Sequence, residues 1–420
     1  MPTLAERFLP PTPLARRLSM QAILFAFGEG AFLTGSAVFF TQIVGLSAAQ
    51  IGLGLTFSGI ASFCLAVPLG KLTDRVGAQR MWALAAGGEA CLYAVWPFVG
   101  SFATFVAMMV LLGLADTGGR SGRGAYTLDV FPREERVESL AFMRAALNIG
   151  FTLGALVGGL ALALDSDAVI RAVPWLTAVI LGCNALLIRG LPAAASDAHE
   201  DAAAGAAAAA EKAISPAALR NRGFLALCTF GGVLGANQVL LNVVIPLWLV
   251  QETDAPRVLL AWLFGTNTVM AVLLQVPAAR GVNSVATSLR AARVSAAFFV
   301  LSCLIVLVTH DPIGWTTILL VWLGHVTVTG AELFQSAAQW GFLAELSDPA
   351  RRGEYQGAAQ LGGTLGGVWA PAAFTFLAIH WGTPGWLLIA AIIVAATAGM
   401  GPASRAAERY LARTDPAAAA

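Results

Sequence analysis

GKLTDRVGAQR, residues 70–80, is a short hydrophilic segment between two long apolar stretches of the chain. Gly70 and Gly77 allow a tight turn and a close approach of neighbouring helices, because glycine has no β-carbon. Asp74 suits the N-terminus of a helix, where negative charge is favoured. The segment is therefore predicted to be a tight loop that joins two membrane-spanning helices.

The composition of the whole chain requires contact with lipid. Of its 420 residues 58% are hydrophobic and 12% are charged, and the mean hydropathy is +0.75. Soluble domains carry about 25% charged residues, so much of this apolar surface must face a bilayer. These values exclude a soluble enzyme, and the net charge of +1 gives no basis for a nucleic-acid partner. The five cysteines stand apart from one another, so neither a metal site nor a disulfide framework is predicted.

Twelve stretches are long and apolar enough to cross a membrane as helices. They are residues 20–44, 48–69, 81–99, 103–129, 141–163, 169–189, 224–249, 258–278, 292–309, 315–345, 355–379 and 384–402. All but four of the 25 lysines and arginines fall on the side of the N-terminus, the even-to-odd loops and the C-terminal tail. Because basic loops stay inside, we expect a multi-pass protein of the cytoplasmic membrane with both termini in the cytoplasm.

A hydrophilic stretch divides the spans into two sets of six. The predicted parts are a first bundle over 1–190, an Ala-rich cytoplasmic linker over 191–222, a second bundle over 223–402 and a cytoplasmic tail over 403–420. The linker is interpreted as a tether, or alternatively as a regulatory element.

The two sets of spans are weakly similar in sequence. A shift of 216 residues superposes span four on span ten, with Asp116 on Glu332 and Asp129 on Glu345. A duplicated six-helix unit is typical of secondary transporters, which bind substrate near mid-membrane.

The segment 70–80 resembles the signature loop of the major facilitator superfamily, GxLxDRxGxR(R/K), and has the same place in the order of spans. The matching residues are Gly70, Leu72, Asp74, Arg75, Gly77 and Arg80. Gln79 stands where that family usually has a further basic residue. The resemblance implies an all-α membrane protein of twelve transmembrane helices in two pseudo-symmetric six-helix bundles, monomeric, with a small-molecule substrate and no cofactor. ATP is not expected either, because the sequence has no P-loop.

In that family the loop holds the two halves in the outward-facing state, so the resemblance implies a gating role. The residues assigned to it are Gly70, Asp74, Arg75, Gly77, Arg80 and Asp129. Asp74 is expected at the start of span eleven near Glu354, with Arg75 or Arg80 bridging Asp74 to Asp129. The corresponding segment 279–283 is expected to be too degraded to act in the same way. Alternatively, the basic residues of the loop only fix the topology.

Span five carries a second resemblance. GFTLGALVGG, residues 150–159, resembles the GxxxGPxxGG sequence of the drug:proton antiporters of the superfamily, with Ala155 in place of the proline. Small residues at this spacing also suit close helix packing of any kind. The two interpretations stay open.

Charged residues inside predicted spans need a reason, because lipid does not tolerate them. Glu29 lies in the middle of span one, and Asp116, Arg120 and Arg123 lie in span four. We assign these four residues to proton coupling. Asp116 is one turn from Arg120 and could neutralise its charge. Arg123 would then be the arginine that faces Glu29. The spacing typical of the family's exporters favours Arg120 as the coupling residue instead. A permanent structural ion pair is the alternative role for Glu29.

Polar residues elsewhere in the spans are candidates for lining a substrate cavity. They are Asn148, Gln238, Asn242, Asn267, Glu332, Gln335 and Gln339. The preferred function is export of a small organic compound, drug-like or a natural product, in exchange for protons by alternating access. The alternatives are a proton-symport importer of a sugar, organic acid or other metabolite and, more remotely, a membrane sensor or scaffold that transports nothing.

Overall fold

The computed structural model describes residues 9–164, 166–193, 217–253, 255–256, 258–309 and 314–414. The centre of the predicted linker, 194–216, and the end of the predicted tail, 415–420, lie outside these residues, so the tether and regulatory interpretations are not addressed. Throughout the described residues the chain forms helices and no β-strand.

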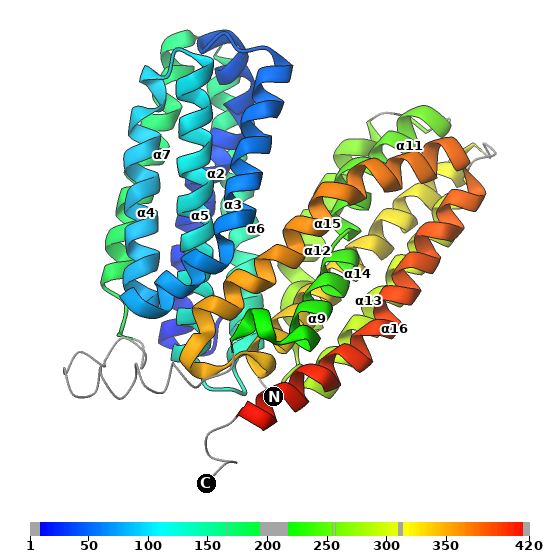
Figure 1. Cartoon of the computed structure of the whole chain (residues 1–420). Helices are drawn as coiled ribbons and strands as arrows, with labels where there is room; N and C mark the ends of the chain where they lie inside the picture. The colour runs from blue at the N-terminus through cyan, green and yellow to red at the C-terminus, as the bar shows by residue number, and fades with distance from the viewer. Residues whose placement is uncertain are drawn as a thin grey trace. The chain divides into compact units, whose positions relative to one another are not determined.

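The helices follow the predicted spans closely (Figure 1). They are α2 (Pro13–Val38), α3 (Ala48–Val76), α4 (Ala78–Val95), α5 (Phe102–Val130), α6 (Arg136–Ala163), α7 (Asp167–Arg189), α9 (Arg222–Leu234), α10 (Asn237–Val239), α11 (Ile245–Glu252), α12 (Leu259–Ala279), α13 (Val285–Leu307), α14 (Trp315–Leu346), α15 (Arg352–Trp381) and α16 (Thr383–Thr414). Shorter elements are the π-helices η1 (Phe39–Ile43) and η5 (Leu240–Val244) and the 3-10 turns η2 (Trp96–Phe98), η4 (Ala218–Arg220) and η6 (Pro349–Arg351). Span seven is thus a run of short helices from α9 to α11, and α16 continues past the predicted end at 402.

Eleven of the described helical segments are long and apolar enough to cross a membrane. The helix predicted as span three, α4, is not among them because Gln79, Arg80 and Glu89 make its 18 residues insufficiently apolar. It packs between α5 and α7 in spite of these residues. The arrangement agrees with the predicted all-α membrane fold.

The chain folds into two compact units. Unit 1 consists of Met1–Pro132, Phe142–Ser215 and Pro349–Gly357, and unit 2 of Arg133–Ala141, Pro216–Asp348 and Ala358–Ala420. In unit 1, α3 packs on α5, α4 packs on α5 and α7, and α2 packs on α7. In unit 2, α12 packs on α14, α13 packs on α14 and α16, and α9 packs on α16. The same four pairings therefore recur in both units, as expected of a duplicated six-helix fold.

Each unit also includes a short segment whose neighbours in the sequence belong to the other unit. Arg133–Ala141, which includes the first residues of α6, is part of unit 2, and Pro349–Gly357, which includes the first residues of α15, is part of unit 1. The two segments are offset by 216 residues, the shift that superposes span four on span ten. This exchange was not predicted, because a division at the linker does not reveal it.

Local sequence signals begin several helices. Ser47, Ser101 and Ser284 each form a capping box with the residue three positions later, which satisfies free N–H groups of the first turn. Between α3 and α4 the chain turns at Gly77 alone, with φ of 99°. A side chain is strained at such an angle, so the predicted tight turn of the loop depends on this glycine.

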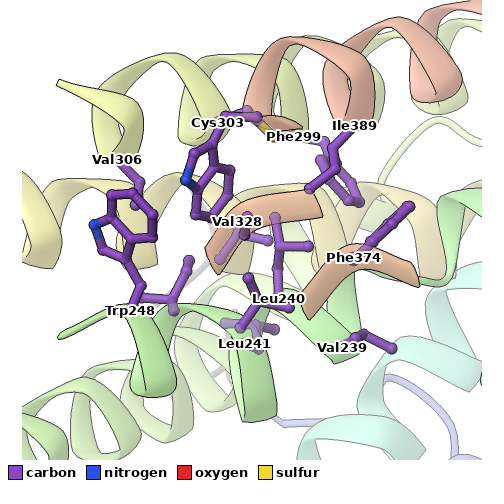
Figure 2. Packing of buried hydrophobic residues seen from close by; sticks show 14 of the residues in the cluster. Val239, Leu240, Leu241, Trp248, Phe299, Cys303, Val306, Val328, Phe374 and Ile389 are labelled. Atoms are coloured by element: carbon purple, nitrogen blue, oxygen red, sulfur yellow. The ribbon is translucent and has the colours of Figure 1, made fainter. Parts of the chain in front are cut away.

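The apolar core of unit 2 joins helices from the whole unit (Figure 2). Trp248 of α11 and Trp386 of α16 meet edge to face with ring centres 5.4 Å apart, and the Trp248 indole donates to the Thr309 hydroxyl at 2.9 Å. Figure 2 shows Phe299 of α13 and Phe374 of α15 in the same cluster. In unit 1, a cluster of buried aromatic residues around Trp96 has the corresponding role.

Candidate functional site

Charged side chains gather within the helices of unit 1. They are Glu29 on α2, Glu89 on α4, Asp116, Arg120 and Arg123 on α5, and Arg144 on α6. Acidic and basic residues thus lie together on the helices of one six-helix unit. Each of them is costly in a bilayer unless other groups stabilise its charge.

Glu29 lies between two glycines that let neighbouring helices come close. A β-carbon at Gly30 would fall on the backbone of Phe151 in α6, so only glycine permits this approach. Glu29 is half-buried, and Tyr93 of α4 lies close to its carboxyl group. The sequence did not single out Tyr93; its distance from Glu29 along the chain hides the contact.

Asp116 and Arg120 form the ion pair that their spacing predicts. The Nε of Arg120 donates to both carboxylate oxygens of Asp116 at 2.9 Å, and its Nη2 completes the pair. Both residues lie on α5 one turn apart. The positive charge of Arg120 is therefore balanced within its own helix.

Contrary to the expectation, Arg123 does not contact Glu29. Its guanidinium lies 6.0 Å from the centre of the Phe25 ring, a cation–π distance. Within the part of the chain that the structure describes, Arg123 forms no ion pair with a carboxylate. The reason is helical register, because Phe25 precedes Glu29 by one turn of α2, so Arg123 meets α2 one turn away from the carboxyl group. The charges that act on Glu29 are those of Asp116 and Arg120.

Glu89 belongs to the same group of charges, although it was not among the residues assigned to proton coupling. Its side chain is buried, and the charges that act on it are those of Asp116, Glu29, Arg123 and Arg120. A β-carbon at Gly119 of α5 would touch it. The signal that could have found Glu89 is an acidic residue inside a span, as with Glu29.

The polar residues predicted to line a cavity fall into separate groups. In unit 2, Asn267 of α12 donates through Nδ2 to a Glu332 carboxylate oxygen at 3.0 Å and to the Thr329 hydroxyl at 3.2 Å, both on α14. This contact holds the buried Glu332 between two helices. Asn148 lies on α6 in unit 1, and its buried Nδ2 has no hydrogen-bond partner within the described residues.

The remaining polar residues of unit 2 pair along their own helices. Gln335 donates to Gln339 at 3.3 Å on α14, and Asn242 donates to Gln238 at 3.3 Å on span seven. These are local contacts one turn apart. The described structure therefore joins Asn267 to Glu332 but does not merge all the predicted residues into one network.

The loop 70–80 contacts the start of α15, as predicted. One carboxylate oxygen of Asp74 accepts from the Gly353 N–H at 2.7 Å and the other from the Glu354 N–H at 2.9 Å. A β-carbon at Gly70 would overlap the Gly353 carbonyl. Lys71 lies 4.0 Å from Glu354. Asp74 thus caps the N-terminus of α15, where the helix dipole favours its charge.

Asp129 at the end of α5 also binds this region. It forms an ion pair with Arg352, and both side chains are largely buried. Arg75 is exposed and makes no ion pair among the described residues, so a bridge from Arg75 to Asp129 is absent. We name Lys71, Asp74, Asp129, Arg352, Gly353 and Glu354 the α15 contact cluster.

The contacts of Gln79 give a physical reason for a glutamine at a position where the superfamily usually has a basic residue. Its side-chain amide donates to the carbonyls of Ile188 and Leu191 at 2.9 and 2.8 Å. These carbonyls are at the C-terminal end of α7, where helix carbonyls lack partners. Gln79 therefore fastens α4 to α7, which a resemblance to the loop could not reveal. Arg80 lies exposed one residue further.

The region of unit 2 that corresponds to the loop 70–80 also carries ion pairs, and the expectation that 279–283 does not act in the same way as that loop stays a prediction. Arg280 lies 3.4 Å from Glu138 of α6, and the Nε of Arg133 donates to Glu345 of α14 at 2.9 Å. The hydrogen bond and negative charge of Glu345 raise the pKa of Arg133, which lies in the loop before α6. We name Arg280, Glu345, Arg133 and Glu138 the α6 contact cluster.

The sequence matches the pattern of the Major Facilitator Superfamily over residues 18–371. Over 136 residues it is 32% identical to "Major facilitator superfamily domain-containing protein 10" of Bos taurus, and over 137 residues 28% identical to the Homo sapiens protein of that name. Each alignment covers 32% of this chain and spans only 28% of the relative's length.

Solved structures of low sequence identity share the fold. The human organic anion transporter MFSD10 (TETRAN) matches with a TM-score of 0.66 and 16% identity over 92% of this chain and 98% of that chain. FucP in the outward conformation matches with a TM-score of 0.69 and 15% identity over 93% and 98%. A double Trp mutant of XylE matches with a TM-score of 0.72 and 14% identity over 96% and 98%.

Proposed function

The chain belongs to the major facilitator superfamily and is a multi-pass membrane transporter, and from this premise we propose that it carries small amphipathic organic anions by alternating access, coupled to protons. One observation carries the choice of substrate class: Arg123 is a cation within the spans that forms no ion pair among the described residues. A half-buried cation without a carboxylate partner of its own is suited to a ligand that brings one.

The surroundings of Arg123 favour a particular kind of anion. A guanidinium presents a planar set of N–H donors that matches a carboxylate or sulfonate in two-point contact. Phe25 adds an aromatic face beside it. A ligand with an acidic group next to an aromatic body would use both. The fold shared with a human organic anion transporter supports the same class.

Glu29 is the proposed proton-carrying group. Carboxyl groups inside transmembrane helices often serve as proton relays, and the charges of Asp116 and Arg120 act on this one. When Glu29 takes up a proton, a negative charge disappears from the interior of unit 1. An anion then binds more strongly at Arg123, because the repulsion between the two negative groups is gone.

Because protonation of Glu29 strengthens anion binding, the proton and the anion are expected to move together in the same direction. Joint binding makes symport of an organic acid the function that the geometry supports best, and Asn267 and Glu332 are proposed to line the path. Export in exchange for protons is the second candidate. It is favoured by the close packing of α6 on α2 through Gly150 and Gly154, in the span that resembles the drug:proton antiporters.

The test is transport by the full-length chain in liposomes under an imposed pH gradient. Aromatic carboxylates and their uncharged amides are offered at equal concentration, and proton movement is followed with an entrapped pH-sensitive dye. We expect carboxylates to enter the liposomes together with protons when the outside is acidic. Movement of anion against the protons would favour export instead. Equal transport of the amides would contradict an anion carrier of either kind.

Two test variants and one control variant connect the assay to named residues. Arg123→Gln is expected to lower carboxylate transport about 10- to 100-fold, the range for loss of a charge-assisted hydrogen bond. The matched control is Arg171→Gln, which removes an exposed arginine near the start of α7. Glu29→Gln is expected to retain anion binding but lose the dependence on the pH gradient. Unchanged gradient-driven transport by Glu29→Gln would remove Glu29 from the mechanism.

A further inference from the structure

Helices α13 and α16 of unit 2 enclose an open groove of about 500 Å³. Its walls are formed by small and apolar side chains at helical spacing on both helices. They are Ala296, Ala297, Val300, Leu301 and Leu304 on α13 and Val394, Thr397, Ala398 and Gly401 on α16. Thr397 donates its hydroxyl to the Ile393 carbonyl at 2.8 Å, so this residue adds no free polar group to the wall.

One end of the groove is positively charged. Arg293 lines it directly, and the guanidinium of Arg405 lies 3.9 Å from the β-position of Gly401. Both arginines are exposed, and neither forms an ion pair within the described ranges. The opposite end, at Leu304 and Val394, is apolar. The groove therefore has the polarity of an amphipathic anion.

The length of the groove suits one leaflet of a bilayer. Arg293 and Leu304 are eleven residues apart on α13, or about 16 Å along the helix axis. The hydrocarbon core of a bilayer is about 30 Å thick, so the groove reaches from the arginines to about mid-membrane. The arginines lie on the side predicted to be cytoplasmic, where anionic lipids are enriched.

We propose that this groove binds one anionic phospholipid, with its headgroup phosphate at Arg293 and Arg405 and an acyl chain along α13 and α16. The proposal is independent of the transported substrate, since all its residues belong to unit 2 and none is assigned to transport. Charge complementarity selects the headgroup, and the small residues Ala297 and Ala398 leave room for the chain.

The test uses the full-length chain in detergent, titrated with phosphatidylglycerol or with phosphatidylcholine of the same acyl chains, and counts bound lipids by native mass spectrometry. We expect one phosphatidylglycerol per chain and at least tenfold weaker binding of phosphatidylcholine. The double variant Arg293→Ala/Arg405→Ala should weaken binding about fivefold for each arginine removed. Equal binding of the two lipids by the unaltered chain would overturn the proposal.

Two further variants separate the site from general surface charge. Arg290→Ala/Arg409→Ala removes the same charge from the same two helices at exposed residues outside the groove lining, and it should leave binding unchanged. Ala297→Trp fills the groove and keeps both arginines, and it should abolish binding of the lipid. A loss in the Arg290/Arg409 variant as large as in the Arg293/Arg405 variant would overturn the proposal. So would a dimer in light scattering that Ala297→Trp converts to monomer, because a second copy would then occupy the groove.

Discussion

The α15 and α6 contact clusters occupy equivalent positions in the repeat, yet they differ in chemistry. In the first, Asp74 accepts two main-chain hydrogen bonds from Gly353 and Glu354. At the shift of 209 residues that superposes Val67 and Pro68 on Val276 and Pro277, Asn283 takes the position of Asp74. Its main chain donates to Thr287 within its own loop at 3.0 Å. Ion pairs survive in both clusters, whereas only the first retains a helix cap.

The two clusters also differ in their exposure to water. The side chains of Arg352 and Asp129 are 14% and 7% exposed, while those of Arg280 and Glu138 are 47% and 36% exposed. Solvent screens the second pair far more than the first. Duplication thus kept the placement of charge, but burial decides how much each cluster contributes.

The largest effect is expected from breaking the buried ion pair of the α15 contact cluster. Arg352→Ala leaves Asp129 buried without this partner and should lower the free energy of unfolding by about 3 kcal/mol. Denaturant unfolding in detergent, followed by tryptophan fluorescence, measures it. Asp129→Ala/Arg352→Ala should recover part of the loss, because no lone charge remains. If the loss of unfolding free energy in the double variant equals the sum of the losses in the two single variants, the two residues do not interact.

The next effect concerns the close approach of two backbones. Gly70→Ala places a methyl group on the Gly353 carbonyl and should cost about 1–3 kcal/mol through displacement of α15. The equivalent position in the second half already carries Ala279. Ala279→Gly is the reverse substitution at that position, and it should cost about 1 kcal/mol, the ordinary cost of glycine in a helix. If Gly70→Ala and Ala279→Gly change the free energy of unfolding equally, the closer approach of the two backbones at Gly70 has no measurable cost.

A smaller effect is expected at the helix cap. Asp74→Asn keeps the shape of the side chain but removes its charge, and it should cost about 1 kcal/mol. If the cluster acts as a gate, the variant should also shift the labelling of single cysteines placed near the two ends of the helices. Identical labelling of the variant and the unaltered chain would leave the cap with a structural role alone.

The smallest effect belongs to the α6 contact cluster. Arg280→Ala removes an exposed ion pair with Glu138 and should change the free energy of unfolding by less than about 1 kcal/mol. Its effect should also shrink as salt is added, because screening weakens surface pairs. A loss as large as that of Arg352→Ala would mean that exposure does not explain the difference between the clusters.

For the functional residues of α2, α4 and α5, contacts within one helix were predicted from the sequence, whereas contacts between two helices were not. Asp116 and Arg120 pair as predicted because the contact lies within one helix and depends only on spacing. The expected contact between Arg123 and Glu29 fails because it depends on the register of two helices. Tyr93 was missed for the same reason, since its partner is on another helix.

The sequence alone determined the membrane fold of this protein. An apolar surplus with few charges excludes a soluble chain, and the order of spans with the loop at 70–80 defines the superfamily. These properties are local or additive, so they can be counted along the chain. Even the contact of Asp74 with the start of α15 followed from a motif whose chemistry is short-range.

Only the tertiary structure decided which partners the charged groups meet. The exchange of Arg133–Ala141 and Pro349–Gly357 between the units, the position of Arg123 over Phe25, and the groove between α13 and α16 all depend on how helices align. A helix can rotate or slide by one turn without changing its apolar character. Packing of side chains fixes that register, and with it the partner of every charge inside the membrane.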